Sequence, residues 1–151
     1  MSDETPSIWH RTPTTADLNA TGRNTMVEHV GIEFTDVGPD YLVARMPVDG
    51  RTRQPYGLLH GGASMVLAET LGSVGAVLTV DPAKALVVGQ EINANHLRAV
   101  RDGHVIGTAR PVHLGGRSQV WGIEIRDEGG RLVCVSRLTL AVLDQRPGRP
   151  A

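Results

Sequence analysis

The segment GGASMVLAETLGSVGAVLTV, residues 61–80, decides the fold. Its side chains are small or apolar, apart from a few hydroxyls and one carboxylate, Glu69, and this composition predicts a single buried helix. A helix that is hydrophobic on nearly every side needs cover on more than one side. A strongly curved sheet wrapped around it, closed by a second subunit, would supply that cover.

Segments of strand character lie on both sides of this helix. The alternation of side chains over residues 41–48 predicts a hairpin over residues 31–47, with its turn at 38–40. After Pro82, strand character returns in residues 86–100, 104–114, 118–127 and 131–144, and glycines mark the short turns. Residues 14–26 predict one or two short capped helical turns. The expected fold class is α+β, an antiparallel sheet of about six strands wrapped around one long central hydrophobic helix.

Length and composition predict one domain without targeting segments. The chain has 151 residues, 40% of them hydrophobic, so we expect a single domain at residues 14–144 between flexible tails at 1–13 and 145–151. A single cysteine, Cys134, excludes an internal disulfide framework and a cysteine-rich metal site. A net charge of -1 with scattered arginines provides no basic field for nucleic acid and no polybasic run for a membrane. We therefore expect a soluble, cytoplasmic protein that binds neither.

Two features of the helix region carry candidate chemistry. Burying an ionised carboxylate without partners costs several kcal/mol, so Glu69 is either used, paired in a structural ion pair, or placed on an exposed stripe. Ser73 lies one turn later on the same face and can form hydrogen bonds there. His60-Gly61-Gly62 precedes the helix, where free N–H groups carry partial positive charge and glycine permits close approach of a ligand. This arrangement predicts an oxyanion site, although His60 alone could simply be a cap.

Taken together, these residues resemble the hotdog-fold acyl-CoA thioesterases. The resemblance runs from about residue 8 to residue 143 and is strongest in MPVDGRTRQPYGLLHGGASMVLAETLGSVGA (46–76), INANHLR (92–98), HLGGRSQVW (113–121) and RLVCVSRLT (131–139). It is greatest for the branch that hydrolyses aryl-CoA thioesters such as 1,4-dihydroxy-2-naphthoyl-CoA, related to the 4-hydroxybenzoyl-CoA thioesterases with a glutamate on the central helix. Branches that act on phenylacetyl-CoA carry aspartate at that position, so Glu69 argues against them.

The resemblance implies a role for each matching residue near the helix. In the family, the helical glutamate attacks the thioester carbonyl or activates the water that does so, and the sequence does not decide between these routes. The implied catalytic residues are Glu69 as this carboxylate, Gly61 as the oxyanion donor, His60 as its support, Gln54 to position the carbonyl or the water, and Ser73 to hold water near the glutamate.

A second set of residues is implied for coenzyme A, whose three phosphates require basic or backbone donors. Its members are His96, Arg98, Gly115, Gly116, Arg117, Ser118 and Arg137. Otherwise, each arginine would be a solvated strand charge and the histidine a structural residue. No cofactor is expected, because coenzyme A is part of the substrate, and no metal is expected, because neither HExxH nor CxxC occurs. The resemblance also implies a homodimer with shared active sites, paired again into a tetramer.

The expected function is hydrolysis of an aromatic acyl-CoA to the free acid and coenzyme A. Two alternatives remain open, namely a non-catalytic acyl-CoA sensor on the same fold and a dehydratase or hydratase of the hotdog type. The joint presence of the glutamine, the His-Gly-Gly segment and the helical glutamate favours hydrolysis over both. The acyl group is harder to predict, since aromatic residues make up 3% of the chain, and the pocket candidates are Tyr56, Leu59, Met65 and Val66.

Overall fold

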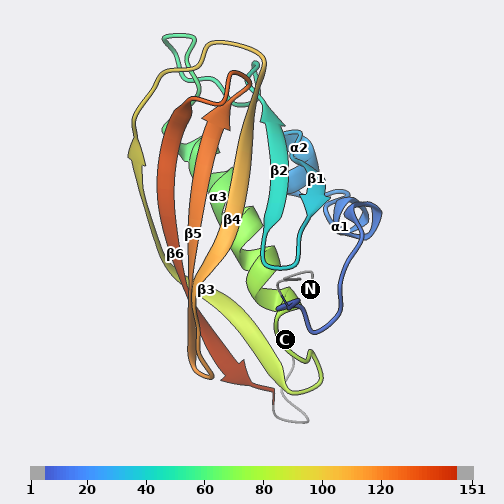
Figure 1. The fold of residues 1–151 in the computed structure, drawn as a ribbon. Helices are drawn as coiled ribbons and strands as arrows, with labels where there is room; N and C mark the ends of the chain where they lie inside the picture. The colour runs from blue at the N-terminus through green and yellow to red at the C-terminus, as the bar shows by residue number, and fades with distance from the viewer. Residues whose placement is uncertain (1–5, 146–151) are drawn as a thin grey trace, which may run out of the picture.

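One long helix lies against one curved antiparallel sheet in the computed structural model, which describes residues 6–145 (Figure 1). The helix is α3, Gly61–Leu78. The strands are β1 Glu33–Val37, β2 Leu42–Pro47, β3 Ala85–His96, β4 His104–Leu114, β5 Ser118–Asp127 and β6 Leu132–Asp144. Their order is β1-β2-β4-β5-β6-β3, and every neighbouring pair is antiparallel. The prediction of a six-stranded sheet around one helix is confirmed.

The inner face of the sheet packs closely on both large and small residues of α3. Leu67 and Leu71 are fully buried between the helix and the sheet. A Cβ atom on Gly75 would lie 2.7 Å from the ring of Trp121, so the helix and β5 approach more closely than any larger residue permits. By length and composition alone, with a mean hydropathy of 1.3, α3 could also cross a membrane. Its packing against the inner face of the sheet is that of a core helix.

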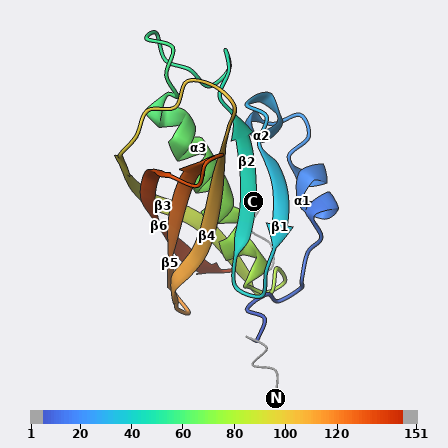
Figure 2. The same cartoon turned by 45° about the horizontal axis from the view of Figure 1, so that its top comes forward.

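The N-terminal segment is more ordered than the sequence predicts. The helices α1, Thr15–Thr21, and α2, Met26–His29, lie beside β1 (Figure 2). Within the expected flexible tail 1–13, however, Trp9 is only 7% exposed and stacks on Trp121 with ring centroids 6.1 Å apart. Its indole N–H also donates to the Gly38 carbonyl at 2.7 Å. The tail prediction is wrong at this residue, because contacts with distant parts of the chain hold it in place.

Two other boundaries also bear on the predictions. β3 ends at His96 rather than at residue 100, because the next two backbone N–H groups both turn to the Val133 carbonyl. In the expected C-terminal tail 145–151, Gln145 donates its backbone N–H to the Lys84 carbonyl at 2.9 Å. Residues 1–5 and 146–151 lie outside the described residues.

The two edges of the sheet differ in how they are covered. At the β1 edge, the Asn19 side chain of α1 accepts from the Phe34 N–H at 2.8 Å and donates to the Phe34 carbonyl at 3.0 Å. This side chain therefore takes the place of a neighbouring strand. At the other edge, β3 runs for 12 residues beside β6 and exposes Leu86 and Val88. Among the described residues, no strand pairs with the outer side of β3.

Candidate active site

Glu69 lies in a largely apolar hollow of about 510 Å³ between α2 and α3. The lining residues are Met26 and Val27 of α2 and Met65, Val66, Glu69, Thr70, Ser73 and Val74 of α3. The Glu69 side chain is half-buried and forms no ion pair or side-chain hydrogen bond within residues 6–145. The structural ion pair considered for this carboxylate is therefore not formed in the described part of the chain.

The carboxylate of Glu69 points toward the open edge strand. Its Oε1 atom lies 2.7 Å from the position that a Cβ atom on Gly89 of β3 would occupy, so a larger residue there would displace the carboxylate from this position. The pairing of β3 with β6 shifts register between Gly89 and Glu91, at the same place. Bulges of this kind often lie next to active sites, where they redirect the backbone. Ser73, one turn further along α3, lines the same hollow, so the predicted pair is brought together.

A second hollow, of about 370 Å³, lies at the N-terminal end of α3. It brings together four predicted residues, Gln54, Gly61, His96 and Arg98, of which the arginine is exposed. A Cβ atom on Gly61 would lie 2.8 Å from His96 Nε2, so the glycine is required for this close approach. Within residues 6–145, the Gly61 N–H donates no hydrogen bond. A free N–H on the first turn of a helix can stabilise a developing negative charge.

His60 acts as the N-cap of α3. Its Nδ1 atom accepts from the Gly62 N–H at 2.8 Å, and its own backbone N–H donates to the Thr52 carbonyl at 2.8 Å. The cap considered for this histidine is therefore present, and it orients the first turn that carries the free Gly61 N–H. A direct contact between the ring and a substrate stays a prediction.

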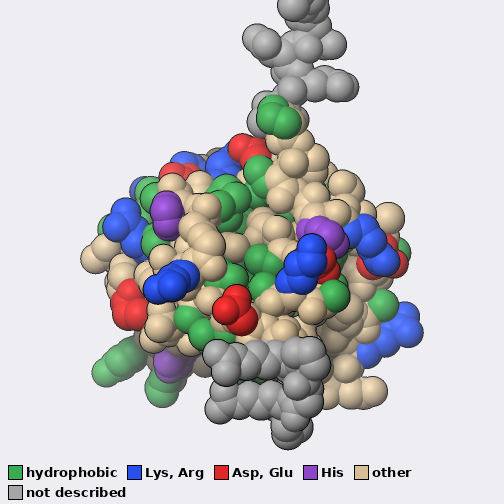
Figure 3. Space-filling view, turned by 90° about the horizontal axis from the view of Figure 1, so that it is seen from below, with side chains coloured by type: hydrophobic (Ala, Val, Ile, Leu, Met, Phe, Trp, Pro, Cys, Tyr) green, Lys and Arg blue, Asp and Glu red, His purple; other side chains and the backbone are tan. Residues whose placement is uncertain are grey.

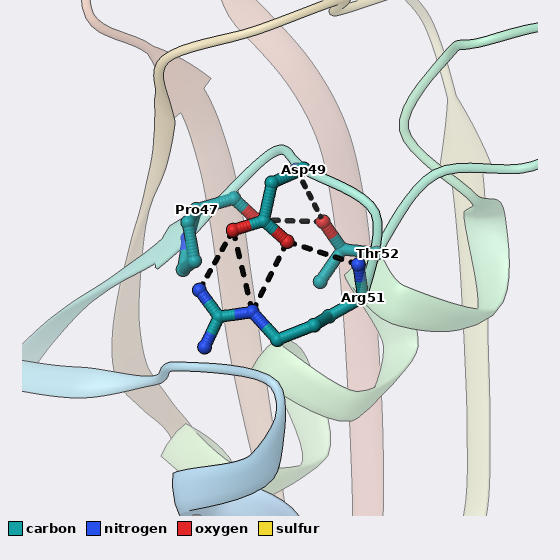
Figure 4. A network of polar contacts seen from close by, with 4 residues as sticks. All are labelled: Pro47, Asp49, Arg51 and Thr52. Carbon is teal, nitrogen blue, oxygen red and sulfur yellow. Dashed lines mark hydrogen bonds and ion pairs between the residues drawn. The ribbon is translucent and has the colours of Figure 1, made fainter.

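The loop before α3 is tied down by a polar network that sequence reasoning missed (Figure 4). The Thr52 hydroxyl donates to the Pro47 carbonyl at 2.6 Å and accepts from the Asp49 N–H at 3.1 Å. The Asp49 carboxylate accepts from the Arg51 backbone N–H at 2.9 Å and from the Arg51 guanidinium at 2.7 Å. These hydrogen bonds lower the pKa of Asp49 to about 2. The spacing Asp-x-x-Thr, typical of side chains that close a turn, was the available signal.

The same loop presents Gln54 toward the second hollow. Its backbone N–H donates to the Leu58 carbonyl at 2.8 Å, and its side-chain Oε1 accepts from the Tyr56 N–H. The side-chain NH₂ group donates no hydrogen bond within residues 6–145. An amide whose oxygen is engaged and whose NH₂ group is free can bind a carbonyl oxygen or a water.

The remaining predicted residues lie elsewhere in the same chain. Gly115, Gly116 and Arg117 form the turn between β4 and β5, and Ser118 begins β5. This turn lies at the C-terminal end of α3, where Gln119 Nε2 donates to Thr79 Oγ1 at 2.8 Å. An 18-residue helix is about 27 Å long, so the turn and the second hollow are at opposite ends of the molecule.

Within one chain, Arg137 lines neither the Glu69 hollow nor the second hollow. It is exposed on β6 between Gly122 of β5 and Asn93 of β3. Because its neighbours Ser136 and Leu138 are buried, the arginine projects from the sheet face opposite α3. Figure 3 views the protein from below and shows Lys, Arg and His side chains scattered between apolar patches rather than joined in one basic surface. A contact between Arg137 and coenzyme A stays a prediction.

Comparison with known proteins decides the family. Residues 56–134 match the model of the Thioesterase superfamily, and this match covers the end of the loop before α3, α3 itself, β3, β4, β5 and the start of β6. The chain belongs to the Thioesterase superfamily. It is 57% identical to 1,4-dihydroxy-2-naphthoyl-CoA hydrolase of Escherichia coli over 90% of this chain and 99% of that protein. It is also 57% identical to the proofreading thioesterase EntH of Cronobacter turicensis, over 90% of this chain and 98% of that protein.

Solved structures of superfamily members have the same fold. A mutant of thioesterase PA1618 from Pseudomonas aeruginosa superposes with a TM-score of 0.90 at 47% identity, covering 92% of this chain and all of that chain (100%). Thioesterase HI1161 from Haemophilus influenzae superposes with a TM-score of 0.90 at 48% identity, covering 94% of this chain and 99% of that chain. The predicted hotdog fold is confirmed, and the chain is a thioester hydrolase of this superfamily.

Proposed function

We propose that this protein hydrolyses the thioester bond of an aromatic acyl-CoA and releases the free acid and coenzyme A. The observation that carries the proposal is the Glu69 carboxylate, which has no polar partner within residues 6–145 and lines an apolar hollow. The 57% identity to an enzyme named as a 1,4-dihydroxy-2-naphthoyl-CoA hydrolase supports an aromatic acyl group.

Glu69 starts the reaction in its ionised form. It either removes a proton from the attacking water or attacks the carbonyl carbon itself, and in the second case water then hydrolyses the mixed anhydride. In both routes negative charge develops on the thioester oxygen, where the free N–H of Gly61 stabilises it. The C–S bond breaks, and the sulfur leaves with its electron pair and takes up a proton as coenzyme A. The proposed reaction uses no further cofactor or metal. A location in the cytoplasm is also part of the proposal, because the lone buried Cys134 is a free thiol and a reducing compartment suits it.

One chain cannot supply both groups to one carbonyl. Glu69 and Gly61 are eight residues apart on α3, roughly 12 Å along the helix axis. The two hollows share none of their lining residues. We therefore propose that each active site is shared between two copies of the chain.

The open edge of β3 favours this dimer. It is 12 residues long, exposes apolar side chains and is uncovered within residues 6–145, unlike the β1 edge. If two copies of β3 pair antiparallel with Gly89 opposite His96, the Glu69 hollow of one copy meets the Gly61 hollow of the other. The same pairing carries the turn at Arg117 toward the second hollow of the partner. Further pairing into a tetramer follows the superfamily resemblance.

Replacement of the carboxylate tests the activity. Glu69→Gln keeps the size of the side chain but removes the base or nucleophile, so turnover of 1,4-dihydroxy-2-naphthoyl-CoA should fall by about 100-fold or more. Binding of a non-hydrolysable thioether analogue should change little. The matched control is Glu124→Gln, an exposed carboxylate on β5 that pairs with Arg126, lies in neither hollow and should leave turnover unchanged. Wild-type turnover in Glu69→Gln would refute the assignment.

Mixed dimers test the shared site. Co-expression of Glu69→Gln with Gln54→Ala gives heterodimers with one doubly altered site and one intact site if the two groups come from different chains. With random pairing, about a quarter of wild-type activity should return. If both groups came from one chain, every site would keep one lesion, and the mixture would stay as inactive as its parents.

Release of free coenzyme A separates the alternatives. A thiol-trapping dye detects coenzyme A after hydrolysis, whereas a sensor or a dehydratase would leave the thioester intact. A panel of 1,4-dihydroxy-2-naphthoyl-CoA, benzoyl-CoA and palmitoyl-CoA would at the same time rank the acyl groups.

A further inference from the structure

We infer that Met26 of α2 forms the outer wall of the acyl pocket and makes the enzyme selective for wide, ring-containing acyl groups over short aliphatic ones. This inference rests on the proposed thioesterase activity of Glu69. It concerns the substrate class of that same site and a residue that the sequence motifs do not include.

The position of Met26 supports this role. Its side chain lines the hollow that contains Glu69, yet it is 63% exposed, which is more than any other methionine or leucine among residues 6–145. The next residue, Val27, is only half-exposed and packs against the hydrophobic core. Val27 therefore anchors α2 in the core while it also lines the hollow, and Met26 lines the hollow from the exposed side of α2.

The backbone of α2 is held at both ends. At its start, the Thr25 hydroxyl accepts from the Val27 N–H at 3.2 Å, and the Asn24 N–H donates to the Glu28 carboxylate at 2.7 Å. Asn24 itself has a positive φ of 58°, a conformation that asparagine tolerates better than most residues. At its end, the Ile32 N–H donates to the Val27 carbonyl at 3.0 Å. The Met26 side chain, rather than the backbone beneath it, is thus the adjustable part of the wall.

The chemistry of the hollow fits an aromatic ring. Its three polar lining residues, Glu69, Thr70 and Ser73, all belong to α3, whereas the α2 side is entirely apolar. A thioester carbonyl at Glu69 would therefore direct its acyl group away from the carboxylate and toward α2. Methionine is unbranched and polarizable, and its sulfur makes favourable contacts with aromatic rings. At about 510 Å³, the hollow has room for a ring system, whereas a four-carbon chain would fill less of it and contact Met26 less.

Truncation of Met26 tests this role with two acyl groups. Met26→Ala should lower kcat/KM for 1,4-dihydroxy-2-naphthoyl-CoA by about five- to tenfold, which is within the range expected for the loss of one thioether–ring contact. It should leave kcat/KM for butyryl-CoA within about twofold, and Met26→Leu, of similar volume, should recover most of the loss. The control is Val112→Ala, an exposed valine on β4 outside this hollow, which should change neither value.

Only a change in the ratio of the kcat/KM values for the two substrates supports the inference. Equal losses for both acyl groups, or no loss for either, would overturn it. A second arm measures the affinity of the two corresponding thioether analogues, which needs no turnover. If wild type releases no coenzyme A from any ester, the proposed activity fails, whereas a selective loss of naphthoyl-thioether affinity in Met26→Ala would still support the pocket wall.

Discussion

Thr52 should stabilise both the fold and the Gly61 half of the active site. Its side chain is 1% exposed, and its hydroxyl joins the Pro47 carbonyl to the Asp49 N–H. Thr52→Val keeps the shape of the side chain and removes both hydrogen bonds. At about 1 kcal/mol for each bond, the free energy of unfolding should fall by about 2 kcal/mol. For a chain of this length, that is a fall in Tm of roughly 4–8 °C by calorimetry or thermal shift.

The same change should lower turnover beyond the loss of stability. The Thr52 carbonyl accepts the backbone N–H of His60, so a displaced loop moves the cap that orients the Gly61 N–H. We expect kcat to fall by roughly tenfold at a temperature where the variant is folded, because small misplacements of catalytic groups are costly. KM for the acyl-CoA should change less.

Two further variants separate positioning from simple destabilisation. Thr52→Ser retains the hydroxyl and should restore kcat. Thr79→Val removes a comparable hydroxyl, which donates to the Ala76 carbonyl at 2.8 Å and accepts from Gln119, but at the far end of α3. It should lower Tm with kcat unchanged. Wild-type kcat in Thr52→Val, or an equal loss of kcat in Thr79→Val, would refute the reasoning.

Three other changes have defined outcomes. Gly61→Ala places a Cβ atom 2.8 Å from His96 Nε2, so we expect it to lower kcat by at least about tenfold in a steady-state assay, and near-normal kcat would contradict the required close approach. Trp9→Ala removes the stack on Trp121 and should cost about 3 kcal/mol in denaturant unfolding, whereas a loss below about 1 kcal/mol would show that the N-terminal segment is not part of the core. The pKa of Asp49 falls to about 2 on folding from its ordinary value of 3.8, so the stability that wild type gains over Asp49→Asn should be complete above about pH 5 and be lost progressively as the pH falls from there through about 2. A pH-independent difference between these two proteins would contradict this linkage.

Local sequence patterns were sufficient for the architecture. The apolar run of α3 and the two-residue period of β2 are local signals, and the glycines at residues 103, 116 and 130 mark turns that the structure contains. Trp9 was not predictable in the same way. Its order depends on Trp121, more than a hundred positions later in the chain, and no local pattern reports such a contact. Contacts that link distant segments override local composition.

In the candidate site, too, local sequence patterns could place neighbouring residues together but could not place residues from distant segments together. Glu69 and Ser73 could be placed together because helical spacing puts them on one face. Gly61 and His96 could be placed together only through the resemblance, since nothing in their separation along the chain brings the end of β3 to the start of α3. Met26 carries no chemical signature and was missed, because its importance lies in which hollow it lines. Thr52 was missed although the Asp-x-x-Thr spacing indicates a turn, because that spacing does not report which loop the turn closes.

The proposed dimer makes the register of one strand a determinant of catalysis. Each residue in an antiparallel strand advances about 3.4 Å, so a slip of two residues between the paired β3 strands would move Glu69 about 7 Å from the partner's Gly61, too far to share a carbonyl. A slip of one residue would instead turn Leu86 and Val88 to the wrong faces of the joined sheet. The bulge at Gly89, which makes room for the Glu69 carboxylate, also breaks the regular pairing of β3 and can define where the partner strand aligns. The feature that admits the catalytic carboxylate to the edge strand would thereby also set the alignment that completes its site.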